Sequence, residues 1–448
     1  MKARYLTAVG LTAVIAVAGC SSNTKSTGNT SSSPTDTNTS APATSTPPSP
    51  STGGDTSASG TLTVWLMTDA QNGWPKEVAA ATTAFNAKFP NVKVDVQYQT
   101  WADHLTKLDS ALAATPPDVV ELGNTETTKY MASGALADIT ADKGKFDNSS
   151  TWLKGLADSV TYQGKLYGVP YYAGARGVIY STDAFAKAGI TAPPTTLDEL
   201  KADGDKLKKV IPANQSAFYW PGKNWYGAMS FVYGYGGDIA SNSGGKWTAE
   251  LESANAQAGL TELKSLYDDL SKAPADIDES KQDASMAQGL AAMIYGNGWE
   301  VGSVNDPKTG NPALKLGSFP MPGKDASAPL PTFLGGSDLV IPAASKNVAW
   351  AEAWINSFVG NDGMTALVND AKPIPNTTSL LNLPAIADSA FTKAAQNSWF
   401  VPTAPNWADV ESQNVLQNML SSILSGKSTI DAATKAADKQ IDTILNGS

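Results

Sequence analysis

The sequence predicts an α/β protein built from two lobes, and two observations carry this prediction. The chain has 448 residues, more than one ordinary hydrophobic core accommodates, so two domains or lobes are expected. Between Thr61 and Ser133, strand-like and helix-like patterns alternate three times, which is typical of a parallel sheet with helices on both faces. Hydrophobic residues make up 42% of the chain and charged residues 17%, which is a globular composition.

The first elements can be placed from the period of their apolar residues. Leu62, Val64 and Leu66 share one face of an alternating segment, which indicates a strand. Pro75 stands where a helix would begin, because proline is favoured at the first helical position. The same reasoning places strands at 61–67, 92–98 and 118–122 and helices at 75–88, 102–114 and 126–133.

Further elements follow along the chain. Thr196 and Glu199 have the spacing of a capping box, so a helix is expected from there to about residue 210. Apolar residues at helical spacing indicate helices near 260–270, 350–358, 408–425 and 429–445. Short apolar runs indicate strands at 165–172, 177–180, 293–295 and 339–341.

The N-terminus reads as an export signal rather than as part of the fold. Lys2 and Arg4 precede an apolar run that is too short for a normal membrane span. The run ends in Val-Ala-Gly-Cys20, which looks like a bacterial lipobox, so we expect residues 1–19 to be removed and Cys20 to be lipidated. The alternative is an ordinary secretory signal with an incidental cysteine.

The segment that follows is expected to be a flexible tether. Residues 21–60 contain no Val, Leu, Ile or aromatic residue, so they cannot bury enough apolar surface to offset the entropy of ordering. With the lipidated Cys20, the segment 20–60 would hold the folded part on the outer face of the cell membrane.

Composition excludes several classes of function. A formal charge of -10 argues against nucleic acid as the ligand. Cys20 is the only cysteine and His104 the only histidine, so we expect no disulfide within the chain, no metal site and no cofactor. His104 is interpreted as a structural residue, exposed or half-buried. Glu121 and Glu126 could in principle act as a glycosidase pair, but no recognised catalytic motif is present, so we expect no enzyme.

Polar and aromatic side chains follow each of the first three predicted strands. In open α/β sheets, ligands bind just beyond the carboxyl ends of the strands. Asp69 and Trp74 follow the first strand, Trp101 follows the second, and Asn124 and Glu126 follow the third. The sequence therefore predicts a ligand site at this edge of the sheet.

Tryptophans at turn-like positions point to a sugar as the ligand. The chain has 12 tryptophans, and an aromatic plane can cover the apolar face of a sugar ring while carboxylates and amides bind its hydroxyls. The alternative for each tryptophan is that it packs beneath a loop. Beyond the first three strands, several tryptophans have polar neighbours of this kind. They are Trp220 and Trp225 with Asn224, Trp299 with Glu300, and Trp407.

Five stretches together resemble the extracellular solute-binding proteins of ABC sugar importers, in the maltodextrin-binding-like branch. They are Thr61–Met67 with the later "FPNVKVDVQ", "PPDVVELGNTETTKYMASGALADIT", "GKLYGVPYYAGARGVIYSTDAFAKAGI", "QGLAAMIYGNGWE" and "FLGGSDLVIP". The resemblance covers essentially all of 60–448.

The resemblance implies the two-lobed type II periplasmic-binding-protein fold. Each lobe would be a mostly parallel sheet flanked by helices, and hinge strands would join the two. The N-terminal lobe would comprise 61–169 plus 337–384, and the C-terminal lobe 170–336 plus 385–448. A sugar would lie in the cleft between them.

The resemblance also implies ligand-binding residues. Asn124 and Glu126 fall in the loop after the third strand, where the family often has an acidic residue and this chain has Thr125. The other positions are Tyr172 and Arg176 at the first crossing, Trp299 in the strand-turn-Trp element, Asp338 at the second crossing and Trp407 in the closing segment, with Trp220, Asn224 and Trp225 matched by composition and rough spacing. The turn Gly296-Asn297-Gly298 would bend the chain so that Trp299 faces the cleft.

The function expected from the sequence is capture of a di- or oligosaccharide by a monomeric, lipid-anchored receptor, which delivers it to an ABC permease. The sequence does not decide among chitobiose-like, cellobiose-like, maltose-like and trehalose-like ligands. The competing functions are a surface-anchored glycoside hydrolase and a receptor for a non-sugar solute.

Overall fold

The protein is described here by a computed structural model, which covers residues 57–101 and 103–447. The predicted signal peptide, the predicted lipidation site Cys20 and nearly all of the predicted tether lie outside these residues. The described residues belong to one compact unit. None of their helices is long and apolar enough to cross a membrane.

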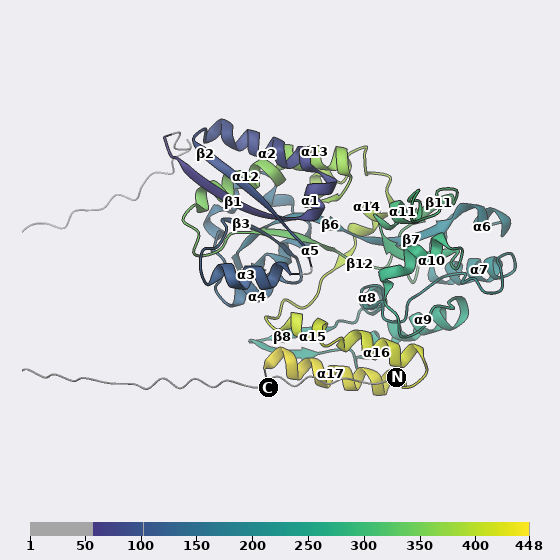
Figure 1. Ribbon diagram of the computed structural model, residues 1–448. Coiled ribbons are helices and arrows are strands. Elements are labelled where there is room, and N and C mark those ends of the chain that lie inside the picture. The colour runs from purple at the N-terminus through teal and green to yellow at the C-terminus, as the bar shows by residue number, and fades with distance from the viewer. Residues whose placement is uncertain (1–56, 102, 448) are drawn as a thin grey trace, which may run out of the picture. The chain divides into compact units, whose positions relative to one another are not determined.

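A six-stranded mixed sheet contains the first predicted strands. Its order is β14-β6-β13-β3-β1-β2, with β1 parallel to both β2 and β3 and the remaining pairs antiparallel. Figure 1 shows this sheet with helices on both faces. The strands are β1 (Gly60–Met67), β2 (Val92–Gln99), β3 (Val119–Gly123), β6 (Gly168–Gly174), β13 (Gly335–Val340) and β14 (Ile374–Pro375).

The helices around this sheet follow from the alternation of its strands. Leu62, Val64 and Leu66 are fully buried on the face covered by α2, α12 and α13, while Val120 and Leu122 pack against α3 and α4 on the other face. The helices are α1 (Thr68–Gly73), α2 (Pro75–Lys88), α3 (His104–Leu112), α4 (Thr127–Ala132), α5 (Lys154–Ser159), α12 (Val348–Val359) and α13 (Asn361–Ala371).

Neither sheet is mostly parallel as expected, since three of the five strand pairs in the first sheet are antiparallel. The second sheet is small. It has the order β10-β7-β11, and both pairs are antiparallel. Single parallel bridges at Ser216 and Tyr219 flank β10. Periodicity marks a strand but not the direction of its partner, which depends on the connections. The strands are β7 (Arg176–Ser181), β10 (Met293–Asn297) and β11 (Leu316–Phe319).

A large helical core surrounds this second sheet, and Leu260, Leu263 and Leu266 are fully buried in it. The helices in this part of the chain are α6 (Thr182–Lys187), α7 (Leu197–Lys208), α8 (Trp225–Gly234), α9 (Ala254–Leu270), α10 (Gln282–Ala287), α11 (Glu300–Val304), α14 (Ala390–Ala395), α15 (Trp407–Ser412), α16 (Val415–Leu424) and α17 (Ile430–Asn446). The remaining strands are short, namely β4 (Thr161–Tyr162), β5 (Lys165–Leu166), β8 (Ala240–Ser243), β9 (Lys246–Ala249), β12 (Thr332–Phe333) and β15 (Ser398–Trp399).

Two predicted elements are interrupted in the structure. The segment 165–172 is divided between β5 and β6. The segment 408–425 is divided between α15 and α16, because Asn414 takes a left-handed conformation with φ 55°. The Thr196 cap forms as predicted, with its side chain accepting from Glu199 N at 3.1 Å, but the Glu199 carboxylate accepts from Thr195 N instead of Thr196 N.

The chain passes between the two sheets three times. β6 continues into β7 with only Ala175 between them. β12 leads into β13 through Leu334, and the segment from β14 to α14 makes the third passage. These three passages bring the ends of both sheets together.

Candidate functional site

A cavity of about 1210 Å³ lies where the three passages meet. Ligand pockets commonly measure about 300–1,000 Å³, so this one has room for more than one ring. Its walls come from the ends of β1, β2 and β3, the β6–β7 passage, the β10–α11 junction, and the segments around β13 and β14.

Eight of the residues predicted from the sequence line this cavity. They come from both sheets, and five of them follow the first three strands as predicted. They are Asp69, Trp74, Trp101, Asn124, Glu126, Tyr172, Arg176 and Trp299.

Two tryptophans after β1 and β2 are held by hydrogen bonds from their indole nitrogens. Trp101 Nε1 donates to Asp69 Oδ2 at 2.5 Å, and Trp74 Nε1 donates to Tyr171 Oη at 2.5 Å. Trp74 also packs edge to face on Tyr172, with ring centroids 5.3 Å apart. Because their nitrogens are occupied, these indoles offer the cavity mainly their apolar surfaces.

Glu126 presents a carboxylate that is fixed on one side. Its Oε2 accepts from Gly123 N at 2.9 Å and lies 2.9 Å from His104 Nε2. His104 is 4% exposed, so it is buried rather than exposed or half-buried. Asn124 is held similarly, since its side-chain amide donates to Leu334 O at 2.8 Å.

Arg176 supplies a cation to the other wall. Its guanidinium lies over the ring of Tyr226 at 4.5 Å and 3.4 Å from Glu279 Oε1. Its Nε is buried and has no hydrogen-bond partner among the residues that the structure describes. Arg176 lines the cavity and therefore contributes a positive charge to its wall.

Trp299 is the most exposed large hydrophobic residue that lines the cavity, at 62%. Its ring lies against Gly174, where an added Cβ would stand 2.7 Å from the ring. The expected turn at 296–298 lies later, at Gly298 and Trp299, since Gly296 and Asn297 are part of β10, and no positive φ occurs there. Gly296 instead leaves space for Glu300, whose carboxylate would lie 2.6 Å from an added Cβ.

Three of the other predicted residues belong to the core around α8. Trp220 is fully buried and stacks on Tyr295 with ring centroids 5.7 Å apart. Asn224 is the N-cap of α8 and accepts from Gly227 N at 2.9 Å, and Trp225 is 3% exposed. They do not line the cavity, because a helix start buries them.

Three more predicted residues are also buried outside the lining. Trp407 is 1% exposed and donates to Glu411 Oε1 at 2.5 Å. Asp338 accepts from Thr127 Oγ1 at 2.7 Å and from Ser159 at 3.0 Å. Glu300 accepts from Asn297 N at 2.7 Å, so it supports the Trp299 turn from beneath instead of facing the cavity.

Burial raises the pKa of several carboxyl groups near the cavity floor. The pKa of Glu121, Glu300 and Asp338 is raised by burial to about 7 in each case. Glu121 Oε2 accepts from Met67 N at 2.8 Å, which ties β3 to the end of β1. These buried carboxyl groups hold the framework of the site together.

The lining residues that sequence reasoning missed include Tyr226, Phe333, Lys372 and Phe391. Tyr226 is the residue next to the predicted Trp225, and the two rings stack at 4.0 Å. Asn224 could have been interpreted as a helix cap. Neighbouring residues of a helix point about 100° apart, so Trp225 and Tyr226 would then have been assigned to different faces.

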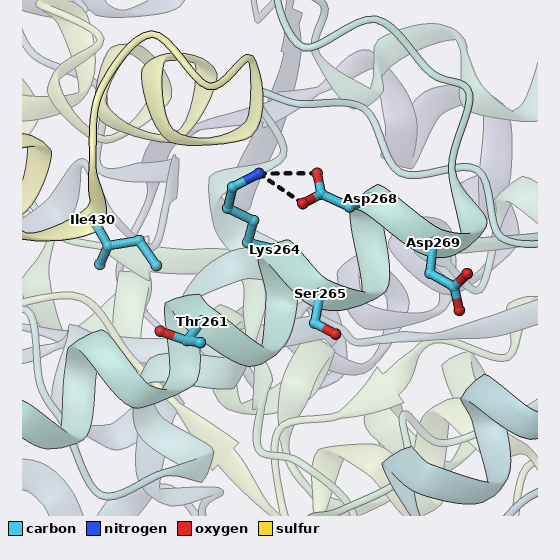
Figure 2. Close-up of a pocket in the computed structure, with 6 residues that line it drawn as sticks. All are labelled: Thr261, Lys264, Ser265, Asp268, Asp269 and Ile430. Carbon is cyan, nitrogen blue, oxygen red and sulfur yellow. Dashed lines mark hydrogen bonds and ion pairs between the residues drawn. The ribbon is translucent and has the colours of Figure 1, made fainter.

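A second hollow of about 560 Å³ lies away from these residues, on α9 beside the start of α17. Figure 2 shows Lys264 bonded to both carboxylate oxygens of Asp268, at 2.9 and 2.7 Å. Thr261, Ser265, Asp269 and Ile430 complete its lining. It has no aromatic wall, so it is not the predicted site.

Among the described residues, no group of His, Cys, Asp or Glu could hold a metal ion.

Comparison with known proteins identifies related sequences. A family model described as bacterial extracellular solute-binding protein matches residues 46–365. The diacetylchitobiose binding protein DasA of Streptomyces coelicolor is 34% identical over 408 residues, covering 88% of this chain and 91% of that protein. The galactooligosaccharide-binding protein of Bacillus subtilis is 24% identical, covering 89% and 93% of the two chains.

Solved structures show the same fold. The sugar-binding protein MalE of Xanthomonas citri has a TM-score of 0.73 at 22% identity and covers 87% of this chain and 98% of its own. A cyclo/maltodextrin-binding protein in complex with maltotetraose also has a TM-score of 0.73, at 20% identity, with 86% and 98% covered. The two-lobed α/β fold expected from the sequence is therefore confirmed.

Proposed function

Because the chain belongs to the bacterial extracellular solute-binding protein family, we propose that it captures a di- or oligosaccharide in the cavity described above and delivers it to an ABC permease. The observation that carries the proposal is the cavity wall itself. It combines the apolar surfaces of Trp101 and Trp299 with the polar groups of Asp69, Glu126 and Arg176. Aromatic planes suit the apolar faces of sugar rings, and charged groups suit their hydroxyls.

The names of two relatives favour a ligand of more than one ring. One relative is a diacetylchitobiose binding protein and another a galactooligosaccharide-binding protein. The cavity of about 1210 Å³ has room for such ligands. Diacetylchitobiose is the first sugar to test, because its binding protein shares the higher identity of the two.

The two lobes are proposed to close on the sugar by a hinge motion. The first lobe would hold the six-stranded sheet and the second lobe the β7 sheet. Because β6 belongs to the first sheet as far as Gly174, we move the proposed boundary from 169/170 to Ala175. The strands β13 and β14 support the return of the chain to the first lobe.

We further propose that the bound sugar is not hydrolysed. The Glu126 carboxylate is engaged by Gly123 N and His104, and Asp69 is engaged by the Trp101 indole, which suits positioning more than proton transfer. The family is extracellular, so the protein is exported. We also propose that the protein is anchored through Cys20, that it is a monomer, and that an ABC permease is its partner.

A thermal-shift screen against a sugar panel tests this function. The panel includes diacetylchitobiose, cellobiose, maltose, trehalose and their monosaccharides. A ligand at 100 times its Kd stabilises the folded state by about 2.7 kcal/mol, so at least one di- or oligosaccharide is expected to raise the melting temperature more than its monosaccharide does. If none of the sugars shifts the melting temperature, the proposal is contradicted. Release of reducing sugar during the incubation would revive the hydrolase alternative.

A further inference from the structure

His104, the only histidine of the chain, lies between two of the proposed ligand-contacting groups. It begins α3 and is 4% exposed. Its ring stands edge-on to the ring of Trp101, with centroids 5.1 Å apart and an interplanar angle of 83°. Its Nε2 lies 2.9 Å from Glu126 Oε2. One buried side chain thus contacts both the aromatic group after β2 and the carboxylate after β3.

Both ring nitrogens of His104 face oxygen atoms. Nδ1 lies 3.0 Å from the carbonyl oxygen of Trp101, which can only accept a hydrogen bond. Nε2 faces the Glu126 carboxylate. A neutral imidazole has a single N–H donor, so a neutral ring beside an ionised Glu126 would leave a lone pair against an oxygen atom. The arrangement therefore needs one proton on Nδ1 and a second proton between Nε2 and Oε2.

The contact between His104 and Glu126 leaves the second carboxylate oxygen of Glu126, Oε1, available to a ligand. Oε2 of Glu126 takes both the His104 contact and the hydrogen bond from Gly123 N. Oε1 accepts no hydrogen bond from any residue that the structure describes, and the Glu126 side chain, 24% exposed, lines the cavity. A sugar hydroxyl could donate to Oε1 while His104 holds Oε2 in place.

We propose that His104 is a positioning residue of the sugar site, and that loss of the proton it shares with Glu126 lowers the affinity for sugar as the pH rises. This inference rests on the proposed function. Without that proton, the neutral ring keeps a single N–H, so a lone pair faces either Oε2 of Glu126 or the carbonyl oxygen of Trp101 and is repelled by it. Glu126 and the Trp101 segment then lose the contact that fixes them relative to one another.

The charged groups nearest the ring favour the protonated state. Burial alone would lower the pKa of His104, but the hydrogen bond to Glu126 and its charge outweigh burial, so the pKa lies above the usual 6.5. A raised histidine pKa means that the interaction is complete below pH 6.5 and is lost as the pH rises through the folded-state value. Glu121 on β3 adds a second carboxyl, whose own pKa of about 7 calls for a control. Asp69 of α1 bonds the Trp101 indole instead.

The remaining charged or titratable groups on α3 and α4 pair with one another on the outer surface of the helices. They are Asp103 with Lys107 at 3.0 Å, and Asp109 with Lys129 at 3.4 Å and with Tyr130 at 2.9 Å.

Nuclear magnetic resonance can follow His104 without any assignment problem, because the chain has one imidazole. The imidazole carbon and nitrogen shifts of the full chain are measured without sugar from about pH 5 to about pH 10. We expect a doubly protonated ring at pH 6.5, with a pKa that falls in Glu126→Gln because the hydrogen bond and the charge of the carboxylate are lost. The matched control Asp103→Asn, on the same helix, should leave the pKa nearly unchanged. A neutral ring at pH 6.5, or no change in Glu126→Gln, would overturn the inference.

Calorimetric titration with diacetylchitobiose tests the effect on binding, and the tightest-binding sugar of the panel replaces it if another binds better. The affinity should fall about tenfold, which corresponds to about 1.4 kcal/mol, as the pH rises through the pKa measured for His104. His104→Gln should bind more weakly at pH 6 and show no such pH dependence, whereas Glu121→Gln should keep it.

The outcomes separate the two proposals. A pH-independent affinity of the unsubstituted protein, or an unchanged pH dependence in His104→Gln, would overturn the role of His104 while leaving the proposed function intact. Failure of every sugar to bind at every pH would overturn the proposed function itself. The melting temperature of each variant, measured without sugar, shows whether it is folded.

Discussion

The cavity wall and the core around α8 hold the same residue type in opposite roles. Trp101 and Trp299, both in the cavity wall, are 41% and 62% exposed. Trp220 and Trp407 are 0% and 1% exposed and pack among other aromatic rings. In the sequence all four stand at turn-like positions beside polar residues.

The difference shows which sequence signals carry information about a site. An aromatic residue directly after a parallel strand must lie at the carboxyl edge of the sheet, where ligands bind. A polar neighbour carries less information, because it can also start a helix, as Asn224 does, or hold an indole in the core, as Glu411 does. Four variants test this difference, and those with the larger predicted changes come first.

Trp220→Ala should strongly destabilise the fold. Trp220 is fully buried against Tyr295 and Phe231, and truncation of a buried tryptophan costs about 3–5 kcal/mol. Chemical denaturation measures the loss of the free energy of unfolding, and Trp220→Phe, which keeps part of the packing, should lose less. An unchanged free energy of unfolding would place Trp220 outside the core.

Asp338→Asn should make stability less dependent on pH. Burial raises the pKa of Asp338 from 3.8 to about 7, so between these values the folded state keeps a proton that the unfolded state has released. The contribution of Asp338 to the free energy of unfolding is complete below pH 3.8. It falls by about 1.4 kcal/mol per pH unit as the pH rises towards 7.

Denaturation of Asp338→Asn at pH 5 and at pH 7 checks this prediction, because asparagine does not titrate. The variant should lose less stability between the two pH values than the unsubstituted protein. Ser159→Ala serves as the control, since it removes a partner of Asp338 but keeps the carboxyl and therefore the pH dependence. Equal slopes for Asp338→Asn and the unsubstituted protein would contradict a buried, protonated Asp338.

Trp299→Ala should reduce sugar affinity and leave stability almost unchanged. An aromatic anchor contributes about 2 kcal/mol to binding, which corresponds to a loss of affinity of about thirtyfold. Because the side chain is 62% exposed, the free energy of unfolding should change by no more than about 0.5 kcal/mol. Calorimetric titration and denaturation together separate the two effects, and an unchanged affinity would remove Trp299 from the site.

Gly174→Ala should produce a smaller loss of affinity by displacing the Trp299 ring. The added Cβ would stand 2.7 Å from that ring, which is exposed and can shift without disturbing the core. We expect an affinity several-fold lower, about 1 kcal/mol, with an unchanged melting temperature. Gly144→Ala, where an added Cβ meets nothing within 4 Å, is the control. Loss of stability in place of affinity would show that Trp299 is fixed more rigidly than its exposure suggests.

Much of the first sheet could be predicted from the sequence because local periodicity determines its elements. β1 and α2 begin or end within one residue of the predicted positions, and their end loops carry the site residues that were expected. The antiparallel direction of β10 and β11 against β7 could not be predicted, since pairing direction depends on contacts distant in sequence.

The half of the site around α8 was predicted less well for the same reason. Trp225 and Tyr226 are adjacent in sequence, yet Trp225 is buried in the core and Tyr226 lines the cavity. Only the helix that begins after Asn224 determines which of the two faces the ligand. The role of His104 likewise depends on its contact with Glu126, 22 residues away.

The most direct test of the central claim is a crystal structure with the tightest-binding sugar of the panel. We expect sugar rings in the cavity between the two sheets, in contact with the Trp101 or Trp299 ring, with a hydroxyl donating to Glu126 Oε1. Sugar density bound elsewhere, with these side chains untouched, would contradict it.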